Sequence, residues 1–385
     1  MAAVAVAAGG VGVAVQVHSG GKSGQVVAAD ITAPSSQSPT PTVVAAQAPV
    51  ITSPPATLLP TAAAPSPAST PASTPNGRSP AGGSAPVAAA AGAKDLGGCP
   101  VAPADSIWRT RIDQLPASPR SAAYVGAIGA GNHLKADFGA GIWDGAPFGI
   151  PITSIPAGTP GAKVSFDEAE ESDKGPYPIP AGALVEGGPQ ADGDRHVIAL
   201  DKATCKVYEL YDAHPQGSGW HAGSGAVFDL KSNTLRPAGW TSADAAGLPI
   251  LPGLARYDEA ASGTIDHALR ITVPRTQNTY LWPARHQASS ATDQSLPPMG
   301  LRLRLKAGVD ISKLSPQAKA IAQALKTYGA IVADGGSAWY VSGTQDDRWN
   351  NSALHQLDAI SGSDFEAVDV SGLQASANSG TARQP

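Results

Sequence analysis

Ionisable side chains are interspersed among apolar residues in the segment GDRHVIALDKATCKVYELYD, residues 193–212. Two runs of β-branched, aromatic and aliphatic residues flank the turn-like stretch Asp201–Thr204, a pattern typical of a β-hairpin. Side chains alternate between the two faces of a strand, so every second residue of each run should face the protein interior. The polar members of that inner face are Asp194, His196, Glu209 and Tyr211.

The expected register of this hairpin pairs Ile198 with Val207 and His196 with Glu209. A loop with an odd number of residues would instead move the side chains of one strand to the opposite face. Asp194 and Glu209 are then diagonal neighbours, with Cα atoms about 7–8 Å apart. Their carboxyl groups could lie at the separations that glycosidases use. The hairpin therefore indicates acid-catalysed cleavage of a glycosidic bond as one candidate chemistry.

His196 and Tyr211 offer a different chemistry on the same face. A polysaccharide lyase needs a base for the proton next to a carboxylate and an acid for the leaving oxygen, and a histidine and a tyrosine near an arginine can supply both. His267, on the apolar side of another predicted strand, is a further candidate, and Arg285 and His286 are outside candidates. The alternative is structural, because a His–Glu pair and an Asp–Tyr hydrogen bond can simply satisfy polar groups at the end of a sheet.

A second group of oxygen ligands lies in an acidic run that precedes a Pro-rich stretch. Closely spaced carboxylates in a loop can bind Ca²⁺, although the ordered spacing of an EF-hand loop is absent. The alternative is a solvated acidic loop, because runs of like charge usually repel one another and stay wet. The candidate Ca²⁺ ligands are Asp167, Glu168, Glu170, Glu171 and Asp173.

The standard catalytic and nucleotide-binding motifs are missing from the sequence. It contains no HExxH, CxxC or GxSxG, and GAIGAGNHL does not satisfy GxGxxG. Lys22 and Ser23 mimic the end of a P-loop, but Gln16 occupies the position of its first glycine. We therefore expect no nucleotide, no organic cofactor and no α/β-hydrolase chemistry.

Composition divides the chain into four parts. Residues 1–98 contain only five charged side chains and no aromatic residue, whereas every Phe, Tyr and Trp lies after Cys99. The apolar N-terminus has the length of a signal peptide but lacks the positive region that should precede it, and it is too short and Gly-rich to predict a transmembrane anchor. The predicted parts are a leader (1–31), a disordered Pro/Ala/Ser/Thr-rich linker (32–98), a single β-rich domain (99–370) and a disordered tail (371–385).

Cysteine usage and charge favour an extracellular or cell-surface location. Cys99 and Cys205 are the two cysteines, and an even pair in an oxidising compartment predicts one disulfide. The net charge of −5 argues against nucleic acid as a partner.

Short strands separated by Gly- and Pro-rich turns dominate the predicted domain. Alternation is strict in residues 264–273 and in Gly300–Lys306, and a helical period is clear in Pro316–Tyr328, with Ser315 as its N-cap. Helical stretches do not alternate with strands, so a βαβ sheet is not expected. The predicted fold is mainly β, an antiparallel, jelly-roll-like β-sandwich with one or two short helices near the C-terminus, preceded by a disordered stalk.

Five segments resemble those of a recurring family of secreted bacterial proteins. They are GWTSADAAGLPILPGLARYDE, HALRITV, WPARHQASS, PPMGLRLRLK and ALKTYGAIVADGGSAWYVSG. The similarity spans roughly Trp108 to Val370, and Gly335-Gly336 stands where the family pattern has Asn-Gly. The resemblance implies one intact extracellular domain and no particular activity.

These patterns together predict a secreted carbohydrate-active protein, a glycoside hydrolase or a polysaccharide lyase that acts on extracellular polysaccharide or cell-surface glycan. Exposed aromatic residues such as Trp220, Trp240 or Trp282 would stack on sugar rings. The alternative is a non-catalytic glycan-binding or adhesion module, or a structural protein of the cell envelope. In that case internal hydrogen bonds would occupy all the polar groups of the hairpin.

Overall fold

The computed structural model describes residues 96–384. The predicted leader, and the predicted linker as far as residue 95, lie outside the described residues. In the described part most elements are strands and the helices are few and short, in agreement with a mainly-β fold. The strands form several sheets, so a single two-sheet sandwich does not describe the arrangement.

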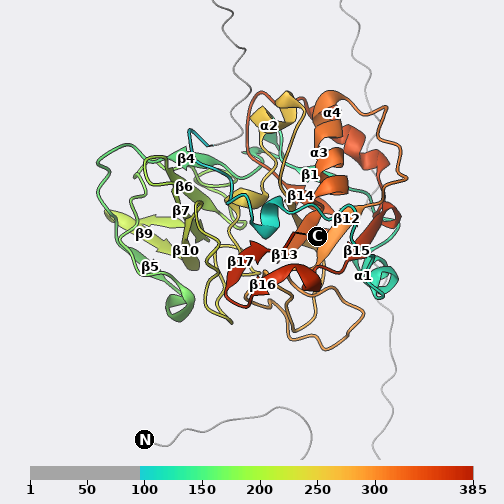
Figure 1. Ribbon diagram of the computed structural model, residues 1–385. Coiled ribbons are helices and arrows are strands. Elements are labelled where there is room, and N and C mark those ends of the chain that lie inside the picture. The colour runs from blue at the N-terminus through green and yellow to red at the C-terminus, as the bar shows by residue number, and fades with distance from the viewer. Residues whose placement is uncertain (1–95, 385) are drawn as a thin grey trace, which may run out of the picture. The chain divides into compact units, whose positions relative to one another are not determined.

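The largest sheet has six strands and lies on the right in Figure 1. In spatial order they are β1 (Lys135–Asp137), β14 (Tyr340–Ser342), β11 (Leu269–Val273), β13 (Ala330–Gly335), β12 (Arg302–Leu305) and β15 (Phe365–Val368). Two pairs, β1 with β14 and β11 with β13, are parallel. All five residues of β11 are buried, although its alternating sequence predicts that one face of the strand is exposed to solvent. Neighbouring elements cover both of its faces, which a single strand's pattern does not reveal.

Two smaller sheets lie on the left in Figure 1. One contains β10 (Ser224–Asp229), β7 (Lys206–Tyr211), β6 (Val197–Asp201) and β4 (Ile152–Ser154), and the other β5 (Val164–Phe166), β9 (Gly219–Ala222) and β8 (His214–Gln216). The pairs β4–β6 and β5–β9 are parallel. Together with the two parallel pairs of the six-stranded sheet they make four, so the prediction of purely antiparallel strands is wrong for these four pairs. Parallel partners are far apart in the chain, and alternation within one strand carries no signal of them.

Short hairpins and helices complete the described part. The hairpins are β2 (Ile142–Trp143) with β3 (Ala146–Pro147), and β16 (Gln374–Ser376) with β17 (Ser379–Ala382). The α-helices are α1 (Ser121–Ile128), α2 (Tyr257–Ser262), α3 (Pro316–Thr327) and α4 (Asn351–Leu354). The 3₁₀ helices are η1 (Ile107–Arg109), η2 (Ala169–Glu171), η3 (Leu251–Gly253), η4 (His355–Ala359), η5 (Gly362–Asp364) and η6 (Ser371–Leu373). None of the helices described here is long and apolar enough to cross a membrane.

Helix α3 matches the sequence prediction to within one residue. Its apolar stripe, which includes Ile321 and Leu325, is buried in the same core cluster as Leu303 of β12. Ser315 occupies the N-cap position, but its hydroxyl makes no capping hydrogen bond. The helix is therefore held mainly by its amphipathic face, as is usual for short helices in proteins.

The hairpin of residues 193–212 forms, but in a register two residues away from the prediction. Ile198 pairs with Glu209 and Leu200 pairs with Val207. The turn is longer than expected because Cys205 takes a left-handed conformation (φ 60°) and its N–H donates to the Asp201 carbonyl at 2.8 Å. A shift of two residues keeps each side chain on its predicted face.

The C-terminal segment also differs from its prediction as a disordered tail, because η6, β16 and β17 lie within residues 371–382. The Arg285 guanidinium donates to the Ala377 carbonyl and to the Asn378 side chain, and Ala382 is buried in the core. A polar, Gly-containing sequence gave no sign of these long-range partners. Hydrogen bonds to an internal arginine order the segment.

The predicted disulfide is confirmed, because Cys99 and Cys205 are bonded across a sequence separation of 106 residues. Closing a loop of this length reduces the entropy of the unfolded chain. We expect a Cys99→Ala, Cys205→Ala variant to lose about 2–5 kcal/mol of unfolding free energy in urea titrations. Reduced wild-type protein, which keeps the side-chain volume, should lose a similar amount. Equal urea midpoints for the oxidised and reduced protein would contradict this role.

Arg302 is a buried cation that has few hydrogen-bond partners to offset the loss of its hydration. Its side chain donates from Nη2 to the Ile107 carbonyl at 2.8 Å, while Nε and Nη1 have no partner among the described residues. Burial lowers the pKa of this guanidinium to about 9, which leaves it charged at neutral pH.

Replacing this charge by an apolar side chain of similar length should therefore stabilise the fold. We expect Arg302→Met to raise the unfolding free energy by about 1–3 kcal/mol. Arg304→Met is the matched control on the same strand, since Arg304 pairs with Glu366 and donates to two backbone carbonyls. It should destabilise the protein, and the same sign for both variants would refute the argument.

Candidate functional site

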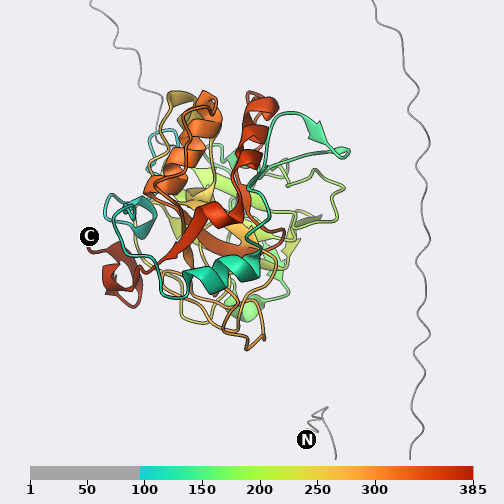
Figure 2. The same cartoon turned by 90° about the vertical axis from the view of Figure 1, so that its right-hand side faces the viewer.

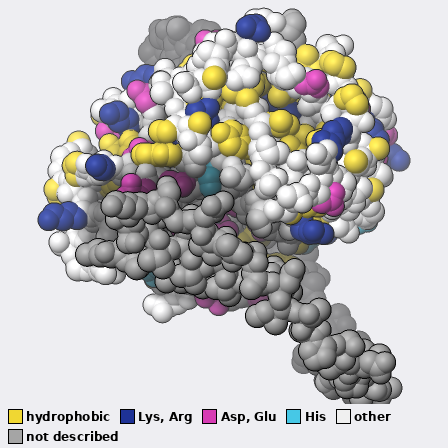
Figure 3. Space-filling model, turned by 90° about the horizontal axis from the view of Figure 1, so that it is seen from below, with side chains coloured by type: hydrophobic (Ala, Val, Ile, Leu, Met, Phe, Trp, Pro, Cys, Tyr) yellow, Lys and Arg dark blue, Asp and Glu magenta, His cyan; other side chains and the backbone are white. Residues whose placement is uncertain are grey.

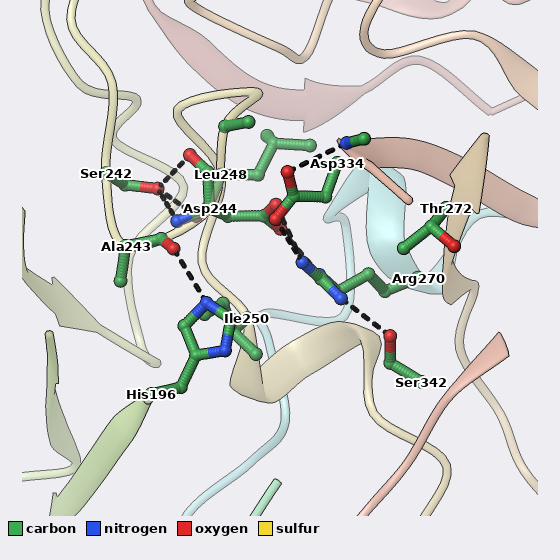
Figure 4. Close-up of polar contacts among 12 residues, drawn as sticks. His196, Ser242, Ala243, Asp244, Leu248, Ile250, Arg270, Thr272, Asp334 and Ser342 are labelled. Carbon is green, nitrogen blue, oxygen red and sulfur yellow. Dashed lines mark hydrogen bonds and ion pairs between the residues drawn. The ribbon is translucent and has the colours of Figure 1, made fainter. Parts of the chain in front are cut away.

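Arg270, on the buried strand β11, holds together side chains from three other segments (Figure 4). Its guanidinium donates to both carboxyl oxygens of Asp244, at 3.1 and 3.3 Å. It also donates to Asp334 Oδ2 at the end of β13 and to Ser342 Oγ in β14, each at 2.6 Å. A planar guanidinium with several fixed donors orients its carboxylate partners in one geometry.

Burial changes the protonation of these two carboxyl groups. It raises the pKa of Asp244 to about 7 even though Arg270 opposes the shift. The pKa of Asp334 is also raised, first by burial and further by the nearby charge of Asp194, against the effect of Arg270 and His196. Both groups therefore hold a proton more readily than an ordinary aspartate does.

His196 lies beside this network and has two acceptors. Its Nδ1 donates to Glu186 Oε2 at 2.5 Å, and its Nε2 donates to the Ala243 carbonyl at 3.1 Å (Figure 4 shows the second contact). Two donating nitrogens define an imidazolium. Burial opposes the charged form, but Glu186 outweighs it and raises the pKa of His196 to about 9.

Asp194, His196 and Asp334 converge. Each offers an oxygen or ring nitrogen within 4.8 Å of those of the other two. Asp137 is exposed at the end of β1, but partial desolvation of its carboxyl group raises its pKa. Glu186 and Asp194 add to this rise in pKa, and Arg270 acts against it. Side chains from β1, β11, β13 and the approaches to β6 therefore meet in one place, which we call the carboxyl cluster: Asp137, Glu186, Asp194, His196, Asp244, Arg270 and Asp334.

The carboxyl cluster opens onto a cleft of about 450 Å³. Its lining includes Tyr211 and His286 and six carboxylates, which are Asp167, Glu168, Glu171, Asp194, Asp212 and Asp334. No Lys or Arg of the described chain lines it. Figure 3 shows acidic side chains beside a histidine near the middle of the face seen from below. The cleft therefore presents a negative surface to any ligand.

The structure separates the predicted catalytic residues into two sets. Asp194 and Tyr211 line the cleft, and His196 lies directly behind it. Glu209 is fully buried, its oxygens accept the backbone N–H groups of Ile250 and Leu251 at 2.8 and 2.9 Å, and burial raises its pKa to about 7. These two hydrogen bonds anchor η3 to β7, which is a structural role.

His267 is also remote from the cleft lining. Its Nε2 contacts Glu259 Oε2 at 3.1 Å and its Nδ1 donates to the Ala268 carbonyl at 2.8 Å. Glu259 is in turn paired with Arg256. His267 thus belongs to a separate, buried polar network with Glu259 of α2 and Arg256.

The acidic run predicted as a Ca²⁺ loop borders the same cleft as Asp194. Glu171 accepts the Thr241 N–H at 2.8 Å, and Asp173 accepts the Val227 N–H at 2.8 Å and pairs with Arg236 at 2.5 Å. Glu170 is exposed and lies outside the lining. The run therefore fixes neighbouring backbone on one side and supplies charge to the cleft on the other.

A metal ion would have one set of ligands to use among the described residues, namely Asp194, His196 and Asp334. Both nitrogens of His196 already donate to protein oxygens, however, and a metal requires a neutral imidazole with a free lone pair. The donor set fits a hydrogen-bonded acid network better than a metal centre.

The sequence patterns did not single out Asp137, Glu186, Asp244, Arg270 or Asp334 as site residues. Two signals were present. Asp334 directly ends an apolar run, Ile331–Ala333, and Asp244 lies in an irregular loop rich in large apolar residues. A charge among residues that must be buried needs a partner. Arg270 gave no such signal, because strand alternation assigned it to the solvent side.

Comparison of the chain with family models, with curated proteins and with solved structures finds no match. The assignment of chemistry therefore depends on the site geometry alone.

The Glu186–His196 ion pair predicts a specific pH dependence of stability. Because the folded pKa of His196 lies above the unfolded value of 6.5, the pair contributes in full below pH 6.5 and is lost as pH rises through about 9. The shift corresponds to roughly 3 kcal/mol at most. We expect Glu186→Gln to remove this change in urea unfolding measured between pH 6 and pH 9.5.

Glu366→Gln is the control, since it removes an ion pair to Arg304. Arginine stays protonated across this range, so the control should lower stability equally at both pH values. A Glu186→Gln variant that keeps the wild-type pH dependence would show that Glu186 does not hold the imidazolium.

Proposed function

We propose that this protein is a carbohydrate-active hydrolase that cleaves a glycosidic bond in the acidic cleft. The observation that carries the proposal is the pair Asp194 and Asp334, whose oxygens lie within 4.8 Å at the cleft wall. Asp194 is exposed, whereas Asp334 is sheltered and its pKa is raised. Two carboxyl groups in contrasting environments are the arrangement that divides acid and nucleophile roles.

In this mechanism Asp334 is the general acid. Arg270 fixes Asp334 Oδ2 at 2.6 Å and the Gly335 N–H fixes Oδ1 at 2.8 Å, so the carboxyl group is positioned before substrate binds. It protonates the leaving glycosidic oxygen, while the Asp194 carboxylate attacks the anomeric carbon. Water then cleaves the glycosyl–Asp194 ester, with Asp334 now acting as base. Carboxyl oxygens within 4.8 Å of each other favour this retaining course, because an inverting enzyme needs a wider gap to admit its water.

The charge of the cleft favours hydrolysis over elimination. A lyase that acts on uronic acids must neutralise the substrate carboxylate, which needs a cation at the site. No Lys or Arg of the described residues lines the cleft, and Arg270 and Arg236 already donate to protein acceptors. A neutral glycan suits the cleft better than a polyuronate.

An extracellular polysaccharide is the substrate that agrees best with the disulfide between Cys99 and Cys205, since such bonds persist in oxidising compartments. A non-catalytic glycan-binding module is the second candidate. It is favoured by the complete internal hydrogen bonding of His196 and Glu209, which removes two of the predicted catalytic groups from the surface.

Turnover of a neutral-glycan panel tests the proposal. The panel contains soluble β-glucan, xylan, galactomannan and starch, and the assay follows new reducing ends. Asp334→Asn should lower kcat on the order of 10²–10⁴-fold, and Asp194→Asn should abolish turnover. Asp113→Asn, which alters a carboxylate that pairs with Arg111 outside the cleft lining, is the matched control and should keep kcat.

Three results would contradict the proposal: full activity in Asp194→Asn, unsaturated products from a polyuronate, or glycan binding with no turnover by the wild-type chain. The last result would establish the binding module instead.

A further inference from the structure

The backbone of the β6–β7 hairpin leaves its regular pairing where it reaches the cleft. The sheet that contains this hairpin lies on the left in Figure 1 and therefore on the far side in Figure 2. The pairing of β6 with β7 ends at Val197 and Leu210. Just beyond these residues, Arg195 and Asp212 both take left-handed conformations, with φ of 49° and 48°. Such a conformation is unfavourable for a residue other than glycine and persists only where the surrounding structure holds it.

The side chain of Arg195 provides contacts that hold this backbone. It is buried, with 4% of its surface exposed, and its Nε donates to the Ala213 carbonyl at 3.1 Å. Its Nη1 donates to the carbonyls of Ala191 and Pro189, at 2.6 and 3.3 Å. The Ala213 N–H donates in return to the Arg195 carbonyl at 3.3 Å. One guanidinium therefore ties the preceding loop and the returning strand to the backbone at residue 195.

Asp194, the residue before this cation, is held only through its backbone. Its carbonyl accepts the Asp212 N–H at 2.8 Å, whereas its exposed side chain makes no hydrogen bond to another residue within 96–384. Asp334 differs, because Arg270 and the Gly335 N–H each fix one of its carboxyl oxygens. The direction of the Asp194 carboxylate therefore depends on how firmly the neighbouring backbone is fixed.

The loop that precedes Asp194 is closed by contacts between its two ends. The Glu186 N–H donates to the His196 carbonyl at 3.0 Å, and His196 Nδ1 donates to the Glu186 carboxylate. Pro189 and Ala191 lie inside this closed loop, so the guanidinium of Arg195 fixes its middle as the Glu186–His196 contacts fix its ends. The backbone on both sides of Asp194 is thus restrained.

We propose that Arg195 is a positioning residue that holds Asp194 opposite Asp334 at the wall of the cleft. This inference rests on the proposed function for the role of Asp194 as the nucleophile. The planar guanidinium suits the task because it donates in fixed directions to the loop and to Ala213 at once. All of its acceptors in the described part are neutral carbonyls, so it acts on Asp194 through geometry.

¹³C NMR titration of the Asp334 carboxyl carbon in the full chain tests this role without relying on turnover. The charge of Asp194 raises the pKa of Asp334, so a variant that lets Asp194 move away should lower the titration midpoint. Loss of a nearby positive charge alone would instead raise the midpoint. We expect Arg195→Met to lower it, and we expect the same substitution to have no further effect when Asp194→Asn is already present.

Arg304→Met is the matched control for the titration. It removes another buried guanidinium that donates to two backbone carbonyls, those of Ile112 and Leu115, on a different sheet. It should lower the stability of the protein and leave the Asp334 midpoint unchanged.

Kinetics on the cleaved glycan give the second readout. Arg195→Met should lower kcat on the order of 10–10²-fold, because a displaced nucleophile is further from its line of attack. KM should change little, since Arg195 does not line the cleft. Arg195→Lys should restore part of kcat, because an ammonium can donate to the same carbonyls but lacks the fixed fork.

The outcomes separate this proposal from the proposed function. An Arg195→Met variant with the wild-type midpoint and kcat, or with a raised midpoint, would overturn the positioning role. A lowered midpoint in a protein whose wild type cleaves no glycan would support the positioning of Asp194 and overturn the hydrolase. If Arg195→Met does not fold, Arg195→Lys is measured in its place, and wild-type values of both readouts would overturn the proposal.

Discussion

The site depends on one buried guanidinium. Arg270 lies on the central strand β11 with 3% of its surface exposed, and its donors hold Asp244, Asp334 and Ser342. A buried charge without partners would cost several kcal/mol, so these contacts must form together. Although burial opposes it, the carboxylates of Asp244 and Asp334 raise the pKa of Arg270 further. Packing of the six-stranded sheet and assembly of the carboxyl cluster are thus one event.

The cluster holds more carboxyl groups than cations. Five of them, Asp137, Glu186, Asp194, Asp244 and Asp334, meet two positive groups, Arg270 and His196. Burial disfavours the ionised form of these carboxyl groups, and the charges of neighbouring carboxylates add to the effect. This explains why the pKa values of Asp137, Asp244 and Asp334 are raised while that of Glu186, paired directly with an imidazolium, is lowered. A proton held beside an exposed carboxylate is what general acid catalysis needs.

The sequence predicted the parts of the fold that local pattern determines. Strand alternation placed Ile198 and Glu209 on one face, the amphipathic stripe located α3, and the cysteine count predicted the disulfide. Long-range pairing decided the rest. Arg270 lies on a strand covered on both sides, and Glu186 reaches His196 from an irregular segment. Neither relation leaves a periodic signal in a single sequence. The sequence therefore predicted Asp194, His196 and Tyr211 as site residues, but it did not predict the charged residues around Arg270.

¹³C NMR titration of the Asp334 carboxyl carbon tests most directly whether burial and Asp194 raise the pKa of this group. We expect Asp334 to titrate above the ordinary aspartate value of 3.8, and we expect Asp194→Asn to move the midpoint down because it removes a neighbouring negative charge. A midpoint at or below 3.8 that does not change in Asp194→Asn would contradict it.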